Sequence, residues 1–261
     1  MTGRISVTID DDGIALLVRD NPPLNVTTVE VTGLLRQQLA ELERDDRVRV
    51  LVIAGEGRRA FGAGSDITEF PDYLDSGNVL SAKMSAENDV QALLEQFSRP
   101  TVAALNGPAY GGGLELALCC DLLIAGESCR LGLPEVKLGL FPGGGGPVRL
   151  ARRIGEGRAR EMLLLGEPVD ASTALAWGLV NRVVPDREVT ATALALAAQL
   201  AVGPTRAMHL AKQALALSWA TPAASAVKAS EPLFAEVFAT ADAAEGVSAF
   251  LQKRPPLFRG R

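Results

Sequence analysis

Two glutamates beside glycine-rich turns are the residues of this chain best suited to chemistry. Glu115 follows the triple glycine at 111–113, and Glu135 follows Pro134 a short way before four glycines at 143–146. Two carboxylates in a poorly solvated cleft repel each other, so the pKa of one rises and the pair can divide acid and base roles. Taken singly, each is equally compatible with a first-turn acid that complements a helix dipole. Their place in an otherwise apolar run favours a site.

The elements around Glu115 would position it. Residues 101–106, TVAALN, predict a buried strand that ends at Gly107-Pro108. The triple glycine that follows lets a ligand or a neighbouring segment approach the backbone. Helical spacing then begins, and the amide groups of a helix N-terminus stabilise negative charge.

A second glycine turn occurs in FGAGSDI, residues 61–67. Here Gly64 can take the backbone angle that a turn requires, which would aim the Ala63 amide at a ligand. The alternative is a plain turn that leads into a helix. The nearby GEGRRA at 55–60 matches a dinucleotide fingerprint only formally, because further glycines follow it where a helix should open.

Composition and charge narrow the function classes. A net charge of -5 disfavours a nucleic-acid partner, which would require a basic face. His209 is the only histidine, so we expect no multi-histidine metal site, and the three cysteines stand in apolar surroundings typical of reduced thiols. The N-terminus shows no leader pattern and no apolar run is long enough to span a bilayer, which predicts a cytoplasmic protein without a membrane partner.

The order of elements predicts an α/β fold. A strand hairpin at 5–20 is followed by an amphipathic helix at 26–46 and a buried strand at 48–55. From residue 188 onward the chain reads as helical, with breaks at Gly203-Pro204 and Thr221-Pro222. We therefore expect a core over residues 1–187 that carries the site, and a helical subdomain over 188–261.

Three segments together resemble a known family: FGAGSDI (61–67), NGPAYGGGLELALCCD (106–121) and LPEVKLGLFPGGGG (133–146). They are similar in order and spacing to the enoyl-CoA hydratase/isomerase (crotonase) superfamily, and the resemblance runs over nearly the whole chain. It implies a crotonase-like ββα-repeat spiral core with a C-terminal helical trimerisation subdomain, and a homotrimer or a homohexamer of two trimers. It also implies an acyl-CoA thioester substrate and no separate cofactor, since coenzyme A is part of the substrate.

The resemblance also assigns roles to residues. The amides of Ala63 and Gly112 would hold the thioester oxygen as it gains negative charge, and Glu115 and Glu135 would hold the attacking water. Contacts with the acyl-CoA are expected at Ala63, Ser65, Asp66, Ile67, Gly111, Gly112 and Pro134. Further candidates, for which ordinary packing is the alternative, are Phe70, Tyr73 and Leu74 near the acyl group and Phe250, Lys253 and Phe258 near coenzyme A.

Hydration of a 2-enoyl-CoA to a 3-hydroxyacyl-CoA, a lyase reaction, is the function we predict. The enzyme alternatives are a Δ3-Δ2-enoyl-CoA isomerase or another reaction of the superfamily. A non-catalytic acyl-CoA-binding protein is a third possibility, disfavoured because a binder needs no water-activating pair of glutamates. The chain departs from the family pattern at Gly144, where alanine is common, and at Pro147-Val148.

Overall fold

The computed structural model describes residues 3–260, and its largest sheet carries the core. The strands of this sheet run in the order β1-β2-β3-β4-β6-β9. They are β1 (Arg4–Ile9), β2 (Ile14–Asp20), β3 (Val50–Gly55), β4 (Thr101–Leu105), β6 (Leu122–Gly126) and β9 (Arg182–Val184). The first two form the predicted antiparallel hairpin, and every later neighbour pairs in parallel. The hairpin predicted at 5–20, which turns at Asp11-Asp12-Gly13, is thus confirmed.

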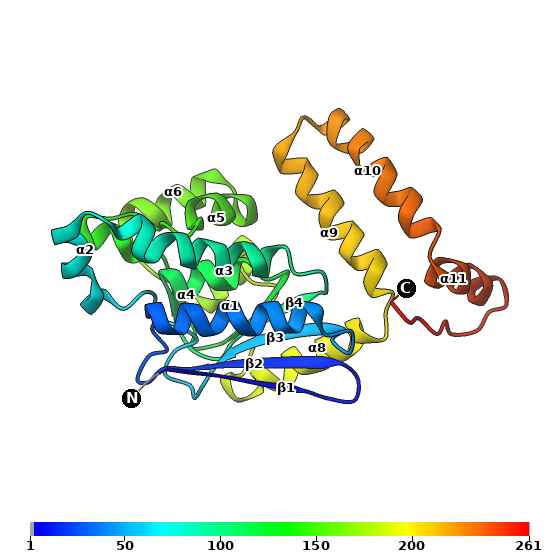
Figure 1. Ribbon diagram of the computed structural model, residues 1–261, viewed down its shortest axis with the longest axis horizontal. Coiled ribbons are helices and arrows are strands. Elements are labelled where there is room, and N and C mark those ends of the chain that lie inside the picture. Colours follow the sequence, from blue (N-terminus) through cyan, green and yellow to red (C-terminus); the bar gives the residue numbers. More distant parts are fainter. Residues whose placement is uncertain (1–2, 261) are drawn as a thin grey trace.

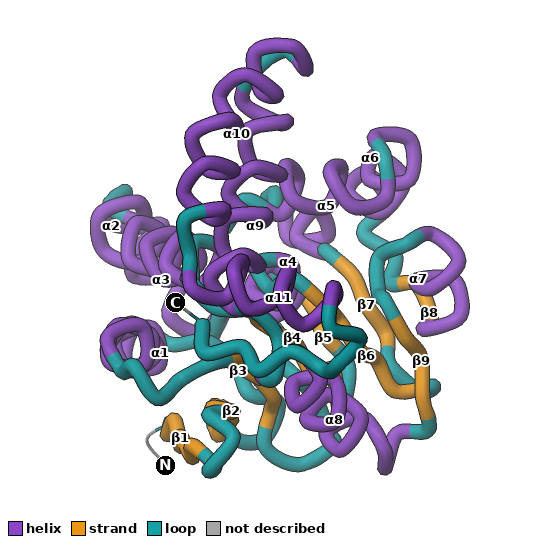
Figure 2. Tube along the Cα trace, turned by 90° about the vertical axis from the view of Figure 1, so that its right-hand side faces the viewer, coloured by secondary structure: helices purple, strands orange, loops and turns teal. Residues whose placement is uncertain are grey.

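Helices cover both faces of this sheet (Figures 1 and 2). Side chains alternate along β3, so Val50 and Val52 face α8 (Val189–Ala201), while Leu51 and Ile53 face the core that contains α1 (Val29–Arg44) and α3 (Ser85–Glu95). A parallel strand buried on both faces must be apolar throughout. This explains the unbroken run VLVIAG in β3.

The first helix shows how the sequence sets these elements. Thr28 caps α1, because its side chain accepts a hydrogen bond from the Val31 amide. Val31, Leu35, Leu39 and Leu42 recur at helical spacing and are buried in the core.

A ββα order recurs along the chain and brings the glycine turns together. β4 leads to β5 (Ala109–Tyr110) and α4 (Gly112–Leu118), and β6 leads to β7 (Arg130–Gly132), a 3₁₀ turn η3 (Pro134–Leu138) and α5 (Gly146–Ile154). β5 and β7 pair in a second sheet with β8 (Val169–Asp170). The α/β fold predicted from the sequence is confirmed.

The last helices form an arm. After α6 (Glu156–Leu165) and α7 (Ala171–Trp177), α8 packs on the sheet. Figure 1 shows that α9 (Thr205–Ala220) then runs away from the sheet and that α10 (Ala223–Phe238) returns beside it to α11 (Ala241–Leu251). α8 packs on the sheet of the core, although the helical subdomain was expected to begin at residue 188. The division between residues 187 and 188 stays a prediction. Within residues 3–260 the helices are too short or too polar to cross a membrane.

Candidate active site

The two glycine turns pack against each other backbone to backbone. Tyr110 N donates to Gly62 O at 2.9 Å, and a Cβ atom placed on Gly113 would lie 2.1 Å from the same oxygen. Gly64 and Gly111 adopt φ angles of 96° and 51°, which side chains disfavour. The glycines are therefore needed to bring residues 62–65 into contact with the start of α4.

Gly113→Ala is expected to destabilise the protein by about 3 kcal/mol, because its methyl group would overlap a backbone oxygen that cannot move freely. The matched control is Gly33→Ala on the exposed face of α1, where a Cβ meets nothing within 4 Å. That change should stabilise by about 0.5–1 kcal/mol. Urea unfolding of both variants measures the difference, and a Gly113→Ala protein as stable as wild type would show that the two turns are not tightly packed.

Two backbone amides lie together where these turns meet. A Cβ atom on Gly112 would be 3.6 Å from Ser65 N, and both residues line one small cavity. Among the hydrogen bonds of residues 3–260, neither the Ser65 nor the Gly112 N–H group has an acceptor. Two adjacent free N–H groups are the arrangement that stabilises a developing oxyanion.

The predicted role of Ala63 needs correction. Its N–H group donates to Leu24 O at 3.0 Å and so is not free for a ligand. Ser65 lies two residues further along, beyond the turn at Gly64, and its amide is the one beside Gly112. Of the two amides predicted, that of Ala63 is taken by Leu24 O, whereas that of Gly112 has no acceptor among residues 3–260 and lies beside the free amide of Ser65.

Glu115 is a buried carboxylate in the first turn of α4, with only 4% of its surface exposed. Burial raises its pKa from the ordinary 4.5 to about 7, opposed by hydrogen bonds from the Gly146 and Gly144 amides and assisted by the charge of Glu135. The Gly146 N–H group donates to Glu115 Oε1 at 2.8 Å. A group with a pKa near neutrality can exchange protons at physiological pH.

Arg149 holds the glycine loop, residues 143–146, which contacts Glu115. Its guanidinium donates to Gly144 O at 2.6 Å, to Gln91 Oε1 at 2.9 Å and to Glu95 Oε2 at 2.8 Å. A Cβ atom on Gly144 would lie 2.3 Å from Gln91 Nε2 and 2.7 Å from Glu115 Oε2. An alanine at this position, common in the family, would displace the ends of the Gln91 and Glu115 side chains. Sequence reasoning missed both Arg149 and Gln91.

Glu135 is the second carboxylate and faces the triple glycine. It is partly buried in η3 after Pro134, and a Cβ atom on Gly111 would lie 2.9 Å from its Oε1. Its Oε2 is buried without a hydrogen-bond partner in the described part of the chain. Burial raises the pKa of Glu135. The structure thus brings both predicted glutamates to the same glycine-rich region.

The remaining predicted contacts lie at different distances from this centre. Gly111 and Pro134 adjoin Glu135, whereas Asp66 caps a 3₁₀ turn, η1 (Ile67–Glu69), through the Thr68 amide, and Ile67 is 55% exposed. Phe70 and Tyr73 are partly buried in α2 (Phe70–Ser76), and Leu74 is exposed. Phe250 belongs to α11, and α11 lies at the far end of the molecule from α2 (Figure 1). Within one chain, α11 therefore does not border the glutamate pair.

The parallel sheet with ββα repeats and a helical C-terminal region define the crotonase fold, and two adjacent free amides lie near one buried and one partly buried carboxylate. The chain belongs to the enoyl-CoA hydratase/isomerase family, whose model matches residues 10–261. This family acts on acyl-CoA thioesters. The chain is a hydratase-type lyase by its relatives.

Three relatives show the extent of the similarity. A probable enoyl-CoA hydratase of Bacillus subtilis (strain 168) is 39% identical over 98% of each chain. The 2,3-dehydroadipyl-CoA hydratase of Escherichia coli (strain K12) is 41% identical over 88% of this chain and 89% of its own. The crystal structure of an enoyl-CoA hydratase from Bacillus anthracis superposes with a TM-score of 0.92 at 33% identity, over 98% of this chain and 99% of the other.

Proposed function

We propose that the protein adds water reversibly across the double bond of a 2-enoyl-CoA thioester to give a 3-hydroxyacyl-CoA. The observation that carries this proposal is the pair of carboxylates, Glu115 buried and Glu135 partly buried, near two free amides, those of Ser65 and Gly112. The hydratase names of the relatives support the same reaction.

The amides would act on the thioester. As water adds at the β carbon, electron density moves to the thioester oxygen, and the Ser65 and Gly112 N–H groups would stabilise that charge. Loss of one such donor typically lowers the rate by about 10²–10³. Because both donors belong to the backbone, only their position can be altered by mutation.

The two glutamates would divide the proton transfers. Hydrogen bonds from two loop amides favour the ionised form of Glu115, so we assign it as the base that takes the proton of the attacking water. The buried Oε2 of Glu135 has no partner among the described residues, which favours its protonated form. We assign Glu135 as the acid that delivers the proton to the α carbon.

The alternatives are weighed by the same geometry. A non-catalytic binder would gain nothing from one buried and one partly buried carboxylate, whose desolvation costs stability. A Δ3-Δ2 isomerase needs a proton carrier but no water-activating pair. The chemistry that we propose requires no cofactor besides the coenzyme A of the substrate.

The direct test measures the loss of the 2-enoyl thioester absorbance with crotonyl-CoA and with a longer 2-enoyl-CoA. Formation of 2-enoyl-CoA from a 3-enoyl-CoA is measured in parallel. Hydration that is faster than isomerisation supports the proposal. Faster isomerisation would favour the isomerase, and binding of both thioesters without turnover of either would favour the binder.

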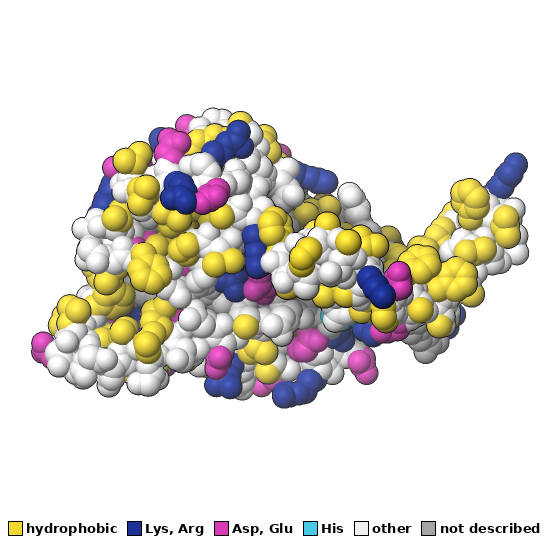
Figure 3. All heavy atoms as spheres, turned by 90° about the horizontal axis from the view of Figure 1, so that it is seen from above, with side chains coloured by type: hydrophobic (Ala, Val, Ile, Leu, Met, Phe, Trp, Pro, Cys, Tyr) yellow, Lys and Arg dark blue, Asp and Glu magenta, His cyan; other side chains and the backbone are white. Residues whose placement is uncertain are grey.

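We also propose that the protein is a homotrimer or a homohexamer. Figure 3 shows yellow, hydrophobic side chains over the part of the molecule at its right. The exposed large hydrophobic residues of α10, α11 and the following segment include Phe234, Phe238, Phe250, Leu251 and Leu257. Monomeric proteins rarely expose so much contiguous apolar surface. Sedimentation equilibrium would give the number of chains directly.

A further inference from the structure

The hydroxyl of Ser65 is tied to a buried carboxylate on another element. Ser65 Oγ donates to Glu87, whose two carboxylate oxygens lie at 3.1 and 3.2 Å. Glu87 belongs to α3 and is 8% exposed. Ser65, which contributes one free amide to the site, is therefore linked to α3 through its own side chain.

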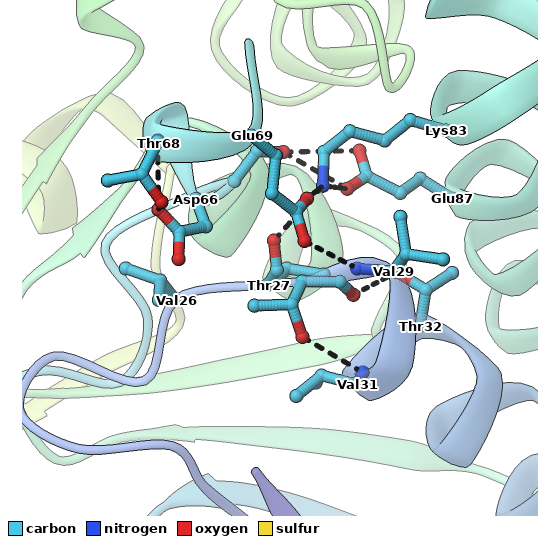
Figure 4. A network of polar contacts seen from close by, with 12 residues as sticks. Val26, Thr27, Val29, Val31, Thr32, Asp66, Thr68, Glu69, Lys83 and Glu87 are labelled. Carbon is cyan, nitrogen blue, oxygen red and sulfur yellow. Dashed lines mark hydrogen bonds and ion pairs between the residues drawn. The ribbon is translucent and has the colours of Figure 1, made fainter. Parts of the chain in front are cut away.

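Glu87 is the first member of an ion network that runs away from the site. Lys83 in the π-helical turn η2 (Leu80–Met84) lies between Glu87 Oε1 at 3.2 Å and Glu69 Oε2 at 2.7 Å, as Figure 4 shows. Its Nζ also donates to Thr27 O at 3.3 Å, and Glu69 Oε1 accepts from the Val29 amide at 3.3 Å. The network joins η1, η2 and α3 to the N-terminus of α1.

The network is buried at Lys83 and Glu87, whereas the side chain of Glu69 is 27% exposed. Lys83 is 1% exposed and forms ion pairs with both carboxylates, Glu69 and Glu87. The nearby Arg19 is also 1% exposed and donates to Thr27 Oγ1 at 2.8 Å. Because a buried charge without a partner is strongly unfavourable, these groups keep one another in place.

The backbone around Ser65 is attached on both sides to the segment before α1, and the side chain of Ser65 adds a third attachment, to α3. Thr27 N donates to Gly64 O and Asp66 N donates to Thr27 O, so the residues on either side are hydrogen-bonded to the strand-like segment before α1. Ser65 itself makes no backbone hydrogen bond through its N–H group among residues 3–260. Its side chain is what links it to α3.

We propose that Glu87 is a positioning residue of the oxyanion site: it holds the Ser65 hydroxyl so that the Ser65 N–H group stays beside that of Gly112. Lys83 and Glu69 keep the Glu87 carboxylate in the orientation that accepts this hydrogen bond. The inference rests on the proposed function, since it assigns the Ser65 amide to the thioester oxygen.

The test compares Ser65→Ala, Glu87→Ala and the double variant with wild type. Each single change should lower kcat for crotonyl-CoA by about 10-fold, less than the 10²–10³ expected for complete loss of a donor, and leave KM nearly unchanged. The double variant should lose no more than either single variant, because both changes cut one tether. Asp89→Asn removes a charge from an exposed position of α3 and is the matched control.

A second readout does not depend on turnover. Butanoyl-CoA has no double bond to hydrate, so the infrared carbonyl frequency of the bound thioester can be measured at equilibrium with a ¹³C-labelled carbonyl. Wild type and Asp89→Asn should lower this frequency more than Ser65→Ala and Glu87→Ala do. Ser65→Ala leaves the ion network intact, so it tests the tether even if Glu87→Ala fails to fold.

The outcomes separate this inference from the proposed function. A folded Ser65→Ala protein with the wild-type carbonyl shift and kcat would overturn the positioning role. Absence of hydration by wild type, with a carbonyl shift that Ser65→Ala reduces, would refute the hydratase and support the tether. Additive losses in the double variant would overturn the single tether.

Discussion

Glu115→Gln should lower kcat for hydration by about 10²–10⁴-fold, the range that a general base contributes. The amide oxygen of glutamine can still accept the Gly146 hydrogen bond that Glu115 Oε1 accepts at 2.8 Å. The fold of the glycine loop should therefore persist while the proton acceptor is lost. Binding of butanoyl-CoA, measured by calorimetry, should change little.

The same variant should be more stable than wild type at alkaline pH. Burial raises the pKa of folded Glu115 to about 7, above its ordinary value of 4.5. Between these values the folded protein binds a proton that the unfolded chain releases, so wild type loses stability as the pH rises through this window. A shift of this size corresponds to about 3 kcal/mol, and a neutral glutamine avoids the loss.

Urea unfolding of both proteins at pH 4.5 and pH 8.5, at one protein concentration, measures this difference. All other titrating groups are common to both proteins, so the change in their stability difference reports Glu115. The activity of wild type, as kcat/KM, should fall below about pH 7, where Glu115 becomes protonated. A Glu115→Gln protein that is inactive and also less stable at pH 8.5 would indicate a structural carboxylate instead of a base.

Sequence reasoning was most successful where local chemistry fixes the backbone. The hairpin expected at 5–20 and the helix expected at 26–46 follow from turn residues and from helical spacing, and both are present. Both glycine turns were recognised, because a run of glycines signals close approach. The structure adds that what approaches each turn is the other turn.

The choice of amide donor shows where such reasoning ends. Ala63, Gly64 and Ser65 are consecutive, and the direction of each N–H group depends on the φ and ψ angles of the turn, which residue types leave open. The acceptor for Ala63, the oxygen of Leu24, lies almost forty residues away in the sequence. A contact of this kind is decided by tertiary packing.

The buried ions were missed for a related reason. Lys83 and Glu87 are spaced like a solvent-exposed i,i+4 pair on an amphipathic helix. Nothing local distinguishes them from a solvated pair, because their burial depends on α1 and on Glu69. Nothing local marks Arg149 either, since its guanidinium donates to Gly144 O and to side chains of α3 that only the fold brings near.

Glu135→Gln should impair both hydration and the exchange of α protons, whereas Glu115→Gln should impair hydration alone. With Glu135 as the acid that serves the α carbon, its loss should lower hydration by about 10²–10⁴-fold. It should also stop exchange of the α protons of butanoyl-CoA with deuterated water, since in that reaction the ionised Glu135 removes the proton. Exchange involves no water addition, so Glu115→Gln should retain it.

The stability of Glu135→Gln provides the control. Because Oε2 of Glu135 is buried without a hydrogen-bond partner in residues 3–260, its replacement breaks no hydrogen bond at that atom, and a neutral glutamine avoids the burial of charge that raises the pKa of Glu135. The variant should therefore unfold at a urea concentration no lower than that of wild type. Proton NMR of butanoyl-CoA in deuterated water follows the exchange. The carboxylate that serves the α carbon is the one whose loss stops the exchange. If exchange survived in Glu135→Gln and stopped in Glu115→Gln, the acid and base roles of the two glutamates would be reversed.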